Sequence, residues 1–170
     1  MVSRTRPTWD ETWFGMAKEL VKRGTCLRRN YSALIVTPDN NLISSGYTGA
    51  PRGTPNCIDI GECYRNKMNI PSGRNYEKCR SVHAEQNAVI NASRKGSTSI
   101  AGCNMYVYGE DAQTGMMVKS APCLMCKRVI INAGIKKVFT LNSEGEKVIY
   151  LVEDWLEESQ EDPFKDLNLI

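Results

Sequence analysis

The stretch "RSVHAEQNAVI" occupies residues 80–90 and contains His83, the only histidine among 170 residues. Apolar residues follow at helical spacing, so the pattern predicts a helix over 82–94 with Ser81 as its N-cap. Glu85 lies two positions after the histidine, in the first turn of that helix. A single imidazole is by default an ordinary polar side chain, so its role depends on partners elsewhere in the chain.

A second stretch, "APCLMCKRVIINAG" at residues 121–134, supplies candidate partners. Its composition predicts another helix, with Pro122 at the first helical position and Gly134 at the end. Cys123 and Cys126 then lie at the start of that helix, where both can bind one ion. The helix N-terminus also favours the thiolate form that metal binding requires.

Together, His83, Cys123 and Cys126 match the ligand set of a catalytic zinc site. Zinc binds cysteine sulfur and histidine nitrogen tetrahedrally, and a catalytic site leaves the fourth position for water. Glu85 is then the candidate catalytic residue, because it can take a proton from the activated water and return it. A purely structural site would not need this carboxylate. A redox role for the two cysteines is the alternative, and it predicts thiols that oxidise reversibly.

The rest of the chain predicts an α/β domain. The expected elements are a helix (9–20), a β-hairpin (31–47), a helix (82–94), a strand (103–109), a helix (121–134), two strands (136–141 and 147–152) and a short acidic helix (153–160). Helices that separate strands at this spacing favour helical layers on a mixed sheet. The short turn at 142–146 predicts that the last two strands are antiparallel. Residues 48–80 are predicted to form a long loop. A loop of this length in a compact domain usually either has a function or is stabilised by additional contacts.

Composition argues against several classes of protein. The chain is 41% hydrophobic and 24% charged, as is usual for a globular protein, and its net charge of +3 argues against an extended nucleic-acid surface. No apolar run approaches the roughly 18 residues of a membrane span, and the first residues lack the apolar region of a signal peptide. We therefore expect a cytoplasmic protein that binds neither membranes nor nucleic acid. In a reducing cytosol, its seven cysteines are expected to be metal ligands or buried thiols, with Cys103 in the core.

The two motifs also carry a family resemblance. H-x-E followed by P-C-x-x-C is the signature of the zinc-dependent nucleobase deaminases. More narrowly, the chain resembles deoxycytidylate (dCMP) deaminases over about residues 9–158. The segments that carry this resemblance are "SALIV" (32–36), "GYTGAPRG" (46–53), "CRSVHAEQNAVI" (79–90) and "APCLMCKRVIINAGIKKVF" (121–139).

This resemblance implies a fold and a reaction. The fold would be the three-layer α/β/α cytidine-deaminase-like fold with a mixed five-stranded sheet, formed by one zinc-dependent deaminase domain over residues 1–170 with a tail at about 161–170. The reaction would be hydrolytic deamination of dCMP to dUMP, a precursor for dTTP synthesis. A zinc-activated water would attack C4 of cytosine, and Glu85 would protonate N3 and the departing ammonia. The Ala84 backbone, Ser120 and Ala121 would line the base pocket.

Regulation and assembly are also implied. Family members are commonly hexamers that dCTP activates and dTTP inhibits, and Mg²⁺ would accompany such a triphosphate. The resemblance places nucleotide contacts at Tyr47, Thr48 and Gly49. Many relatives have asparagine where this chain has Thr48, which leaves the sugar contact and the allosteric response open.

Four further cysteines, Cys26, Cys57, Cys63 and Cys79, lie before and along the long loop. Some dCMP deaminases carry a second, structural zinc in this neighbourhood, so these residues are candidate ligands. The alternative is that they are ordinary thiols.

A nucleotide substrate also needs donors for its phosphate, and arginine binds phosphate in a bidentate manner. Arg28 and Arg52 are the first choices, because they lie beside the first strand and the "GYTG" turn.

Other functions remain open at the level of sequence. Within the superfamily, the substrate could be dCTP, free cytosine or a tRNA adenosine, although a tRNA enzyme should be more basic. From a different class, the chain could be a zinc- or nucleotide-binding module without catalysis. Such a module would gain nothing from Glu85 beside an open metal position.

Overall fold

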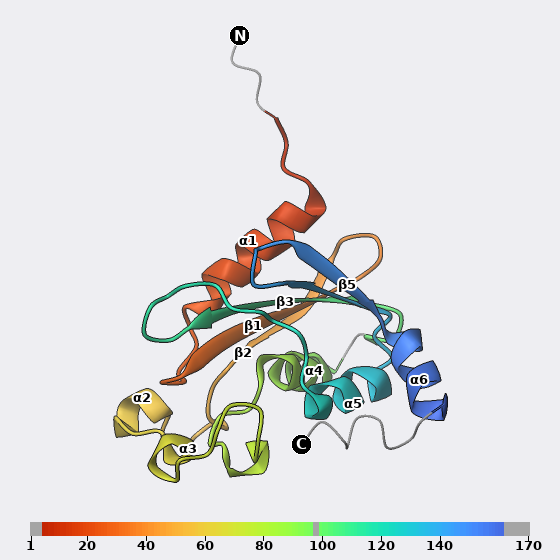
Figure 1. Cartoon of the computed structure of the whole chain (residues 1–170). Helices are drawn as coiled ribbons and strands as arrows, with labels where there is room; N and C mark the ends of the chain where they lie inside the picture. The colour runs from red at the N-terminus through yellow and green to blue at the C-terminus, as the bar shows by residue number, and fades with distance from the viewer. Residues whose placement is uncertain (1–4, 97–98, 162–170) are drawn as a thin grey trace.

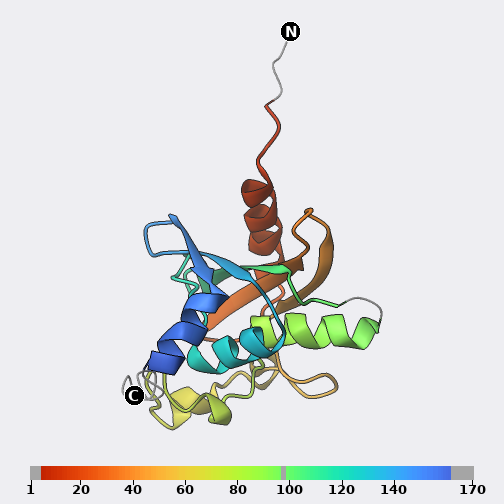
Figure 2. The ribbon, with the colours of Figure 1, turned by 90° about the vertical axis from the view of Figure 1, so that its right-hand side faces the viewer.

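The computed structural model describes residues 5–96 and 99–161, so the predicted tail lies outside the described residues from position 162 onward. A five-stranded sheet with the strand order β2-β1-β3-β4-β5 forms the middle layer, and helices cover both of its faces (Figures 1 and 2). The strands are β1 (Arg29–Val36), β2 (Leu42–Tyr47), β3 (Asn104–Asp111), β4 (Lys137–Leu141) and β5 (Lys147–Leu151).

Within this sheet, β3 and β4 pair in parallel, and the other neighbouring strands pair antiparallel. The predicted three-layer fold with a mixed sheet is confirmed, and so is the antiparallel pairing of the last two strands. Among the described residues, no helix combines the length and the apolar character needed to cross a bilayer.

Alternate side chains of the central strands enter two separate cores. Ala33 and Ile35 of β1 pack under α4 (Ala84–Lys95), α5 (Leu124–Asn132) and α6 (Val152–Glu161). Leu34 and Val36 pack on the other face, against α1 (Trp9–Val21). Because successive strand residues point to opposite faces, a strand covered on both sides is apolar at nearly every position. This explains the unbroken "ALIV" of β1.

The segment 48–80, predicted as a loop, contains three single-turn helices. They are α2 (Cys57–Ile60), α3 (Tyr64–Lys67) and the 3₁₀ helix η1 (Tyr76–Lys78). Helices this short have almost no intrinsic stability, so sequence periodicity cannot reveal them. A β-bridge between Gly49 and Val82 joins the two ends of the segment. In Figure 1 the segment lies at one end of the sheet, next to the start of α4.

α4 lies very close to β2 because Gly46 has no side chain. A Cβ atom at this position would lie 2.3 Å from the backbone nitrogen of Ala88. Two side chains bond across the contact: the Ser44 hydroxyl donates to the Ala88 carbonyl at 2.7 Å, and the Asn87 amide donates to the Tyr47 carbonyl at 2.8 Å. These contacts fix the first turns of α4 against the sheet.

Both helices at the predicted site begin later than expected. His83 is the N-cap of α4, and its N–H donates to the Gln86 side chain at 3.2 Å. Cys123 is the N-cap of α5. The predictions that Ser81 caps the first helix and that Pro122 begins the second are therefore wrong. In both helices the cap position is occupied by a predicted metal ligand.

Candidate metal centre and active site

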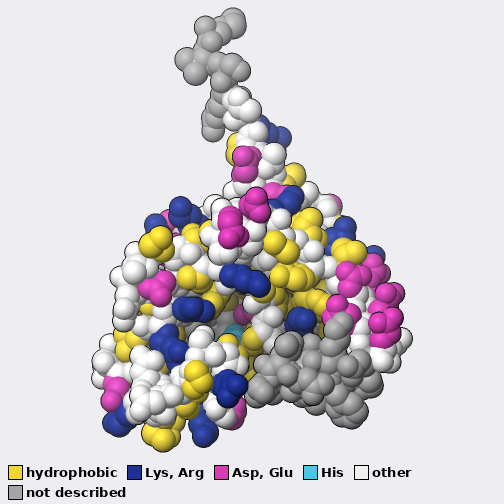
Figure 3. Space-filling view, viewed as in Figure 1, with side chains coloured by type: hydrophobic (Ala, Val, Ile, Leu, Met, Phe, Trp, Pro, Cys, Tyr) yellow, Lys and Arg dark blue, Asp and Glu magenta, His cyan; other side chains and the backbone are white. Residues whose placement is uncertain are grey.

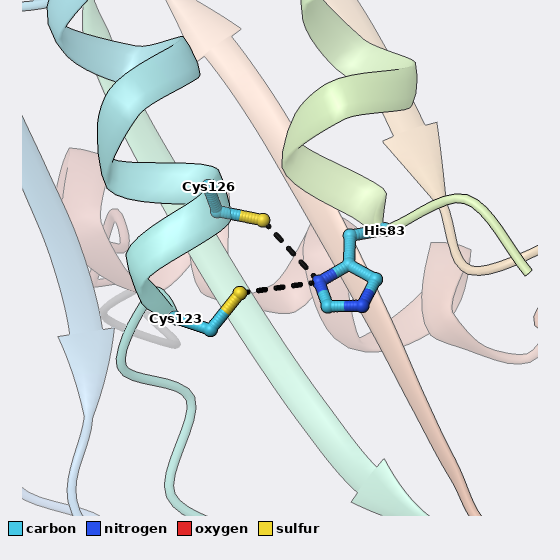
Figure 4. A group of neighbouring side chains, drawn as sticks. All are labelled: His83, Cys123 and Cys126. Atoms are coloured by element: carbon cyan, nitrogen blue, oxygen red, sulfur yellow. Dashed lines mark hydrogen bonds between the residues drawn. The ribbon is translucent and has the colours of Figure 1, made fainter. Parts of the chain in front are cut away.

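The starts of α4 and α5 bring the three predicted ligands together (Figure 4). The Nδ1 atom of His83 lies 3.5 Å from the Cys123 sulfur and 3.3 Å from the Cys126 sulfur. All three donor atoms lie within 4.8 Å of one another. Figure 4 shows both sulfur atoms and the ring nitrogen pointing toward a common centre.

This donor set fits zinc. Tetrahedral zinc with bonds of about 2.0 Å to nitrogen and about 2.3 Å to sulfur places those two donors roughly 3.5 Å apart. The two nitrogen–sulfur separations observed here are close to that value. Within residues 5–96 and 99–161, no other group of three histidine, cysteine or acidic side chains is this compact.

The thiols of Cys123 and Cys126 have pKa values shifted in opposite directions. A hydrogen bond with the Cys126 thiol, helped by another with His83, lowers the pKa of Cys123 to about 4. The same cysteine pairing, together with burial, raises the pKa of Cys126. One thiolate is therefore already favoured before metal binding, and the second proton must leave when the ion enters. Zinc affinity should accordingly fall as the pH falls.

Glu85 lies beside these ligands and is almost fully buried, with 6% of its surface exposed. Burial raises the pKa of its carboxyl group above the ordinary value. A raised pKa suits a group that must hold a proton and release it near neutral pH. Glu85 does not belong to the ligand group, so its carboxyl group can act on a molecule that enters the cavity.

A cavity of about 390 Å³ opens above the metal centre, with His83, Glu85 and Cys123 in its lining. The 48–80 segment and the start of β1 supply much of the remaining wall. Four arginines belong to that lining, namely Arg28, Arg29, Arg65 and Arg80. Figure 3 shows basic side chains gathered around a hollow on this face, with the histidine colour visible inside it. The site therefore combines a metal centre with a positively charged mouth.

Comparison with known proteins identifies the family. The sequence model described as "Cytidine and deoxycytidylate deaminase zinc-binding region" matches residues 7–142. The chain belongs to this deaminase family.

Two relatives show how far the similarity extends. The chain is 33% identical over 138 residues to the deoxycytidylate deaminase of Schizosaccharomyces pombe, covering 80% of this chain but only 38% of that protein. It is 31% identical over 139 residues to the deoxycytidylate deaminase of Mycobacterium phage D29, covering 79% of this chain and 94% of that one. The chain thus spans less than half of the fission-yeast protein and nearly all of the phage protein.

A solved structure has the same fold. It is the dCMP deaminase of the cyanophage S-TIM5 in complex with dCMP and dUMP. It superposes with a TM-score of 0.58 at 22% identity, covering 91% of this chain and 94% of that one. At this identity, the likeness supports the deaminase fold.

The cavity gathers some of the predicted binding residues and not others. The predicted residues in its lining, besides the metal centre and Glu85, are Arg28, Thr48, Ala121 and the cysteines Cys26, Cys57, Cys63 and Cys79. The structure does not place Tyr47, Gly49, Arg52, Ala84 or Ser120 in that lining.

Two of these residues have other partners. The guanidinium of Arg52 donates to the Asn91 side chain at 2.5 Å, away from the cavity. The Ser120 hydroxyl donates to the Val107 carbonyl at 3.0 Å and accepts from the Leu141 N–H at 3.2 Å. The buried Ser120 side chain therefore bridges the backbones of β3 and β4. Its hydroxyl is already engaged by these bonds and is not available to a base.

Thr48 lines the cavity, but its hydroxyl serves the backbone of Tyr31. It accepts from the Tyr31 N–H at 3.0 Å and donates to the Tyr31 carbonyl at 3.4 Å. This pair of bonds continues the β1–β2 pairing by one residue. In this family member, the threonine thus holds a cavity wall together.

Tyr76, Arg65 and Tyr31 are among the cavity residues that the sequence analysis missed. Tyr76 places its ring perpendicular to that of His83, with centroids 4.8 Å apart, and the Arg65 guanidinium lies 4.8 Å from the centre of the Tyr76 ring. The Tyr31 ring packs closely on Gly109, where an added Cβ atom would lie 2.4 Å from the ring. The single-turn helices that position Arg65 and Tyr76 have no periodic pattern, so the sequence gives no local indication of these two residues.

Proposed function

We propose that this chain catalyses the zinc-dependent hydrolytic deamination of dCMP to dUMP, a precursor for dTTP synthesis. The observation that carries the proposal is the buried Glu85 carboxyl beside a compact nitrogen and sulfur ligand set in one cavity. The names of the two relatives support dCMP as the substrate, since both are deoxycytidylate deaminases. The S-TIM5 enzyme was solved with dCMP and dUMP, the proposed substrate and product.

His83, Cys123 and Cys126 would hold the zinc ion, which supplies the Lewis acidity that brings the pKa of a water molecule toward 7. Glu85 would accept one proton of the attacking water and pass it to N3 as the water oxygen bonds to C4 of the cytosine. It would then carry the second proton of that same oxygen to the exocyclic amine, which leaves as ammonia when the C4–N bond breaks. One water is consumed and one ammonia is released, so no oxidant or reductant is needed.

The surrounding residues would hold the base and restrict water. Ala121 lies in the cavity lining two residues before Cys123, where a small side chain leaves room for a planar ring. Tyr76 covers one side of the His83 imidazole and orients that ligand. Burial of Glu85 strengthens its interactions with the developing charges, because the site has a lower dielectric constant than water.

The test is a product assay by chromatography on zinc-loaded protein, with dCMP, dCTP, deoxycytidine, CMP, cytosine and a tRNA adenosine substrate. Selective conversion of dCMP to dUMP is the expected result. Conversion of another base would move the assignment elsewhere in the family. Absence of turnover with every substrate, in protein that carries zinc, would favour a binding module and overturn the proposal.

We also propose a second zinc bound by cysteines of the 48–80 segment and its neighbour Cys26. Cys26, Cys57, Cys63 and Cys79 all face one cavity, and burial raises the pKa of the Cys57 thiol, which the other three cysteines raise further. Their sulfur atoms do not form a group as compact as the catalytic one, so binding would require the segment to tighten. Cys26→Ser should lower the zinc content from about two to about one per chain, whereas Cys103→Ser should leave it unchanged. An unchanged content in Cys26→Ser would exclude that cysteine.

We further propose that the chain forms a single domain and acts in the cytoplasm as a homo-oligomer, with a hexamer favoured. dCTP with Mg²⁺ would activate it and dTTP with Mg²⁺ would inhibit it, at a site near Thr48 and Gly49. The family resemblance supports these proposals. Sedimentation velocity and dCMP turnover, each measured with and without the two triphosphates, would test them. A monomer whose rate is indifferent to both nucleotides would refute them.

A further inference from the structure

Arg65, on the single-turn helix α3, is fixed in the cavity wall. Only 6% of the residue is exposed, and it belongs to the cavity lining. Its Nη2 atom donates to the carbonyl oxygens of Pro71 at 2.8 Å and Arg74 at 2.5 Å. The guanidinium also lies 4.8 Å from the centre of the Tyr76 ring. These contacts hold the group in one orientation before any ligand binds.

The charge of this guanidinium has no counterion in the described part of the chain. The ion pairs found there all involve lysines. Among residues 5–96 and 99–161, the buried Nε atom of Arg65 finds no hydrogen-bond partner, and both hydrogen bonds of this guanidinium there use Nη2. Burying a charge is costly unless an opposite charge compensates it. A fixed cation that lacks such a partner therefore fits an anionic ligand.

The place of Arg65 relative to the metal centre specifies which anion fits. The Tyr76 ring contacts both groups: its centre lies 4.8 Å from the Arg65 guanidinium carbon and 4.8 Å from the centre of the His83 ring, so Arg65 lies in the wall near the metal centre. The cytosine ring must lie at the floor of the cavity, beside His83 and Glu85, for its C4 atom to reach the metal centre. A nucleotide whose base reaches the metal centre therefore directs its phosphate away from the floor, toward the arginine-bearing wall.

We propose that Arg65 binds the 5′-phosphate of the substrate and so makes the enzyme select a nucleoside monophosphate over a nucleoside. This inference rests on the proposed function and identifies the residue that recognises the phosphate group of the substrate. Because Nη2 already donates to the carbonyls of Pro71 and Arg74, the Nη1 group is left to donate to a phosphate oxygen in a charge-assisted hydrogen bond. Arg28 also lines the cavity, but it is less buried, and its Nη1 atom donates to the Ile70 carbonyl at 3.2 Å. Arg65 is therefore the principal contact.

The alternative role for Arg65 is purely structural, since its bonds to two carbonyls also hold the segment 71–74. The two roles differ in how they treat substrates. Loss of a structural support would impair dCMP and deoxycytidine alike. Loss of a phosphate contact would impair only dCMP, because deoxycytidine has no phosphate.

The test compares kcat/KM for dCMP and for deoxycytidine in zinc-loaded wild type, Arg65→Gln and Arg65→Lys. Arg65→Gln should lower kcat/KM for dCMP by about 100-fold, because it removes one partner of a desolvated charge pair. The value for deoxycytidine should change by less than about 3-fold, within the usual effect of a neutral substitution. Arg65→Lys keeps the charge but loses the planar guanidinium that the two carbonyls orient, so its loss for dCMP should be intermediate.

Two further measurements make the outcome decisive. Inorganic phosphate should inhibit dCMP turnover competitively in the wild type, and this inhibition should weaken in Arg65→Gln. Arg23→Gln is the matched control, because Arg23 is an exposed arginine beyond α1 and outside the cavity lining. It should behave as the wild type with both substrates.

Equal losses for dCMP and deoxycytidine, or no loss for dCMP, would overturn the role of Arg65. If Arg65→Gln fails to fold or to hold zinc, the same ratio measured in Arg65→Lys decides, and an unchanged ratio there overturns the inference. Failure of the proposed function has a different signature: the zinc-loaded wild type would deaminate neither substrate.

Discussion

Replacing Gly46 by alanine should damage the metal centre without touching any residue in it. Gly46 lies in β2, directly under α4. An added Cβ would lie 2.3 Å from the Ala88 nitrogen and 2.4 Å from the Ala84 oxygen. Both are backbone atoms of the helix, so no side chain can rotate away to relieve the clash.

The size of the effect follows from these distances. An ordinary contact begins at 3.4 Å, so α4 and β2 must separate by about 1 Å. Overpacking of this kind destabilises a protein by about 1–3 kcal/mol. The shift also moves His83 and Glu85, because both lie at the start of α4. A displacement of about 1 Å in a reacting group lowers the rate by roughly 100-fold.

Three measurements on Gly46→Ala test this reasoning: urea unfolding, zinc content and dCMP turnover. Gly15→Ala is the matched control, because a Cβ atom at that helical, exposed position meets nothing within 4 Å. The control should be stabilised by about 0.5–1 kcal/mol, since alanine is the better helix former, and its turnover should be unchanged.

The reasoning would be refuted if Gly46→Ala unfolded at the wild-type urea concentration and kept full turnover. A loss of stability with unchanged turnover would show that α4 relaxes without moving its first turn. In that case, the helix–strand contact would not position the site.

Three other predictions concern individual side chains. Glu85→Gln should keep its zinc but lose at least about 10³-fold in kcat, because it can neither accept nor return a proton; near-normal turnover would rule out the assigned role. Cys126→Ser should lower the zinc content, whereas Cys103→Ser should not, because Cys103 is buried in the core away from the ligand group; metal analysis of both variants distinguishes a ligand from a packing thiol. Although burial opposes the shift, hydrogen bonding to Lys147 helps to hold the pKa of Asp10 below 3.8. The ionised carboxylate therefore stabilises the folded state at neutral pH, and this contribution is lost as the pH falls through the folded-state pKa. Asp10→Asn should thus unfold at a lower urea concentration than the wild type at pH 7, and the unfolding midpoints of the two proteins should converge in acid. A difference between the midpoints that stays constant with pH would contradict the pairing of Asp10 with Lys147.

The metal centre was predictable because its chemistry leaves a local signal. His83, Cys123 and Cys126 are residue types with few other uses at a helix start, and the spacing of the two cysteines allows both to reach one ion. The sheet was equally predictable, because the buried strands are apolar and helices separate them. The starts of α4 and α5 were each misplaced by two residues, since a serine or a proline is a commoner helix-start residue than a histidine or a cysteine.

The cavity wall could not be predicted in the same way. Its shape depends on contacts between residues of the 48–80 segment, such as the Arg65 guanidinium on backbone carbonyls, which follow no periodic pattern. Arg52 lies beside the "GYTG" turn in sequence, but the backbone directs it to Asn91 instead. Proximity along the chain was therefore a poor guide to proximity in the cavity.

The placement of metal ligands at two helix starts makes the stability of the folded protein depend on zinc. His83 and Cys123 belong to separate helices, and closing the loop of about 40 residues between them in an unfolded chain costs roughly 4 kcal/mol of entropy. In the folded chain the sheet has already brought them together. An ion that binds this arrangement and not the unfolded chain shifts the folding equilibrium by mass action. The melting temperature should thus rise with free zinc, and the abundance of the folded protein would follow the supply of the metal.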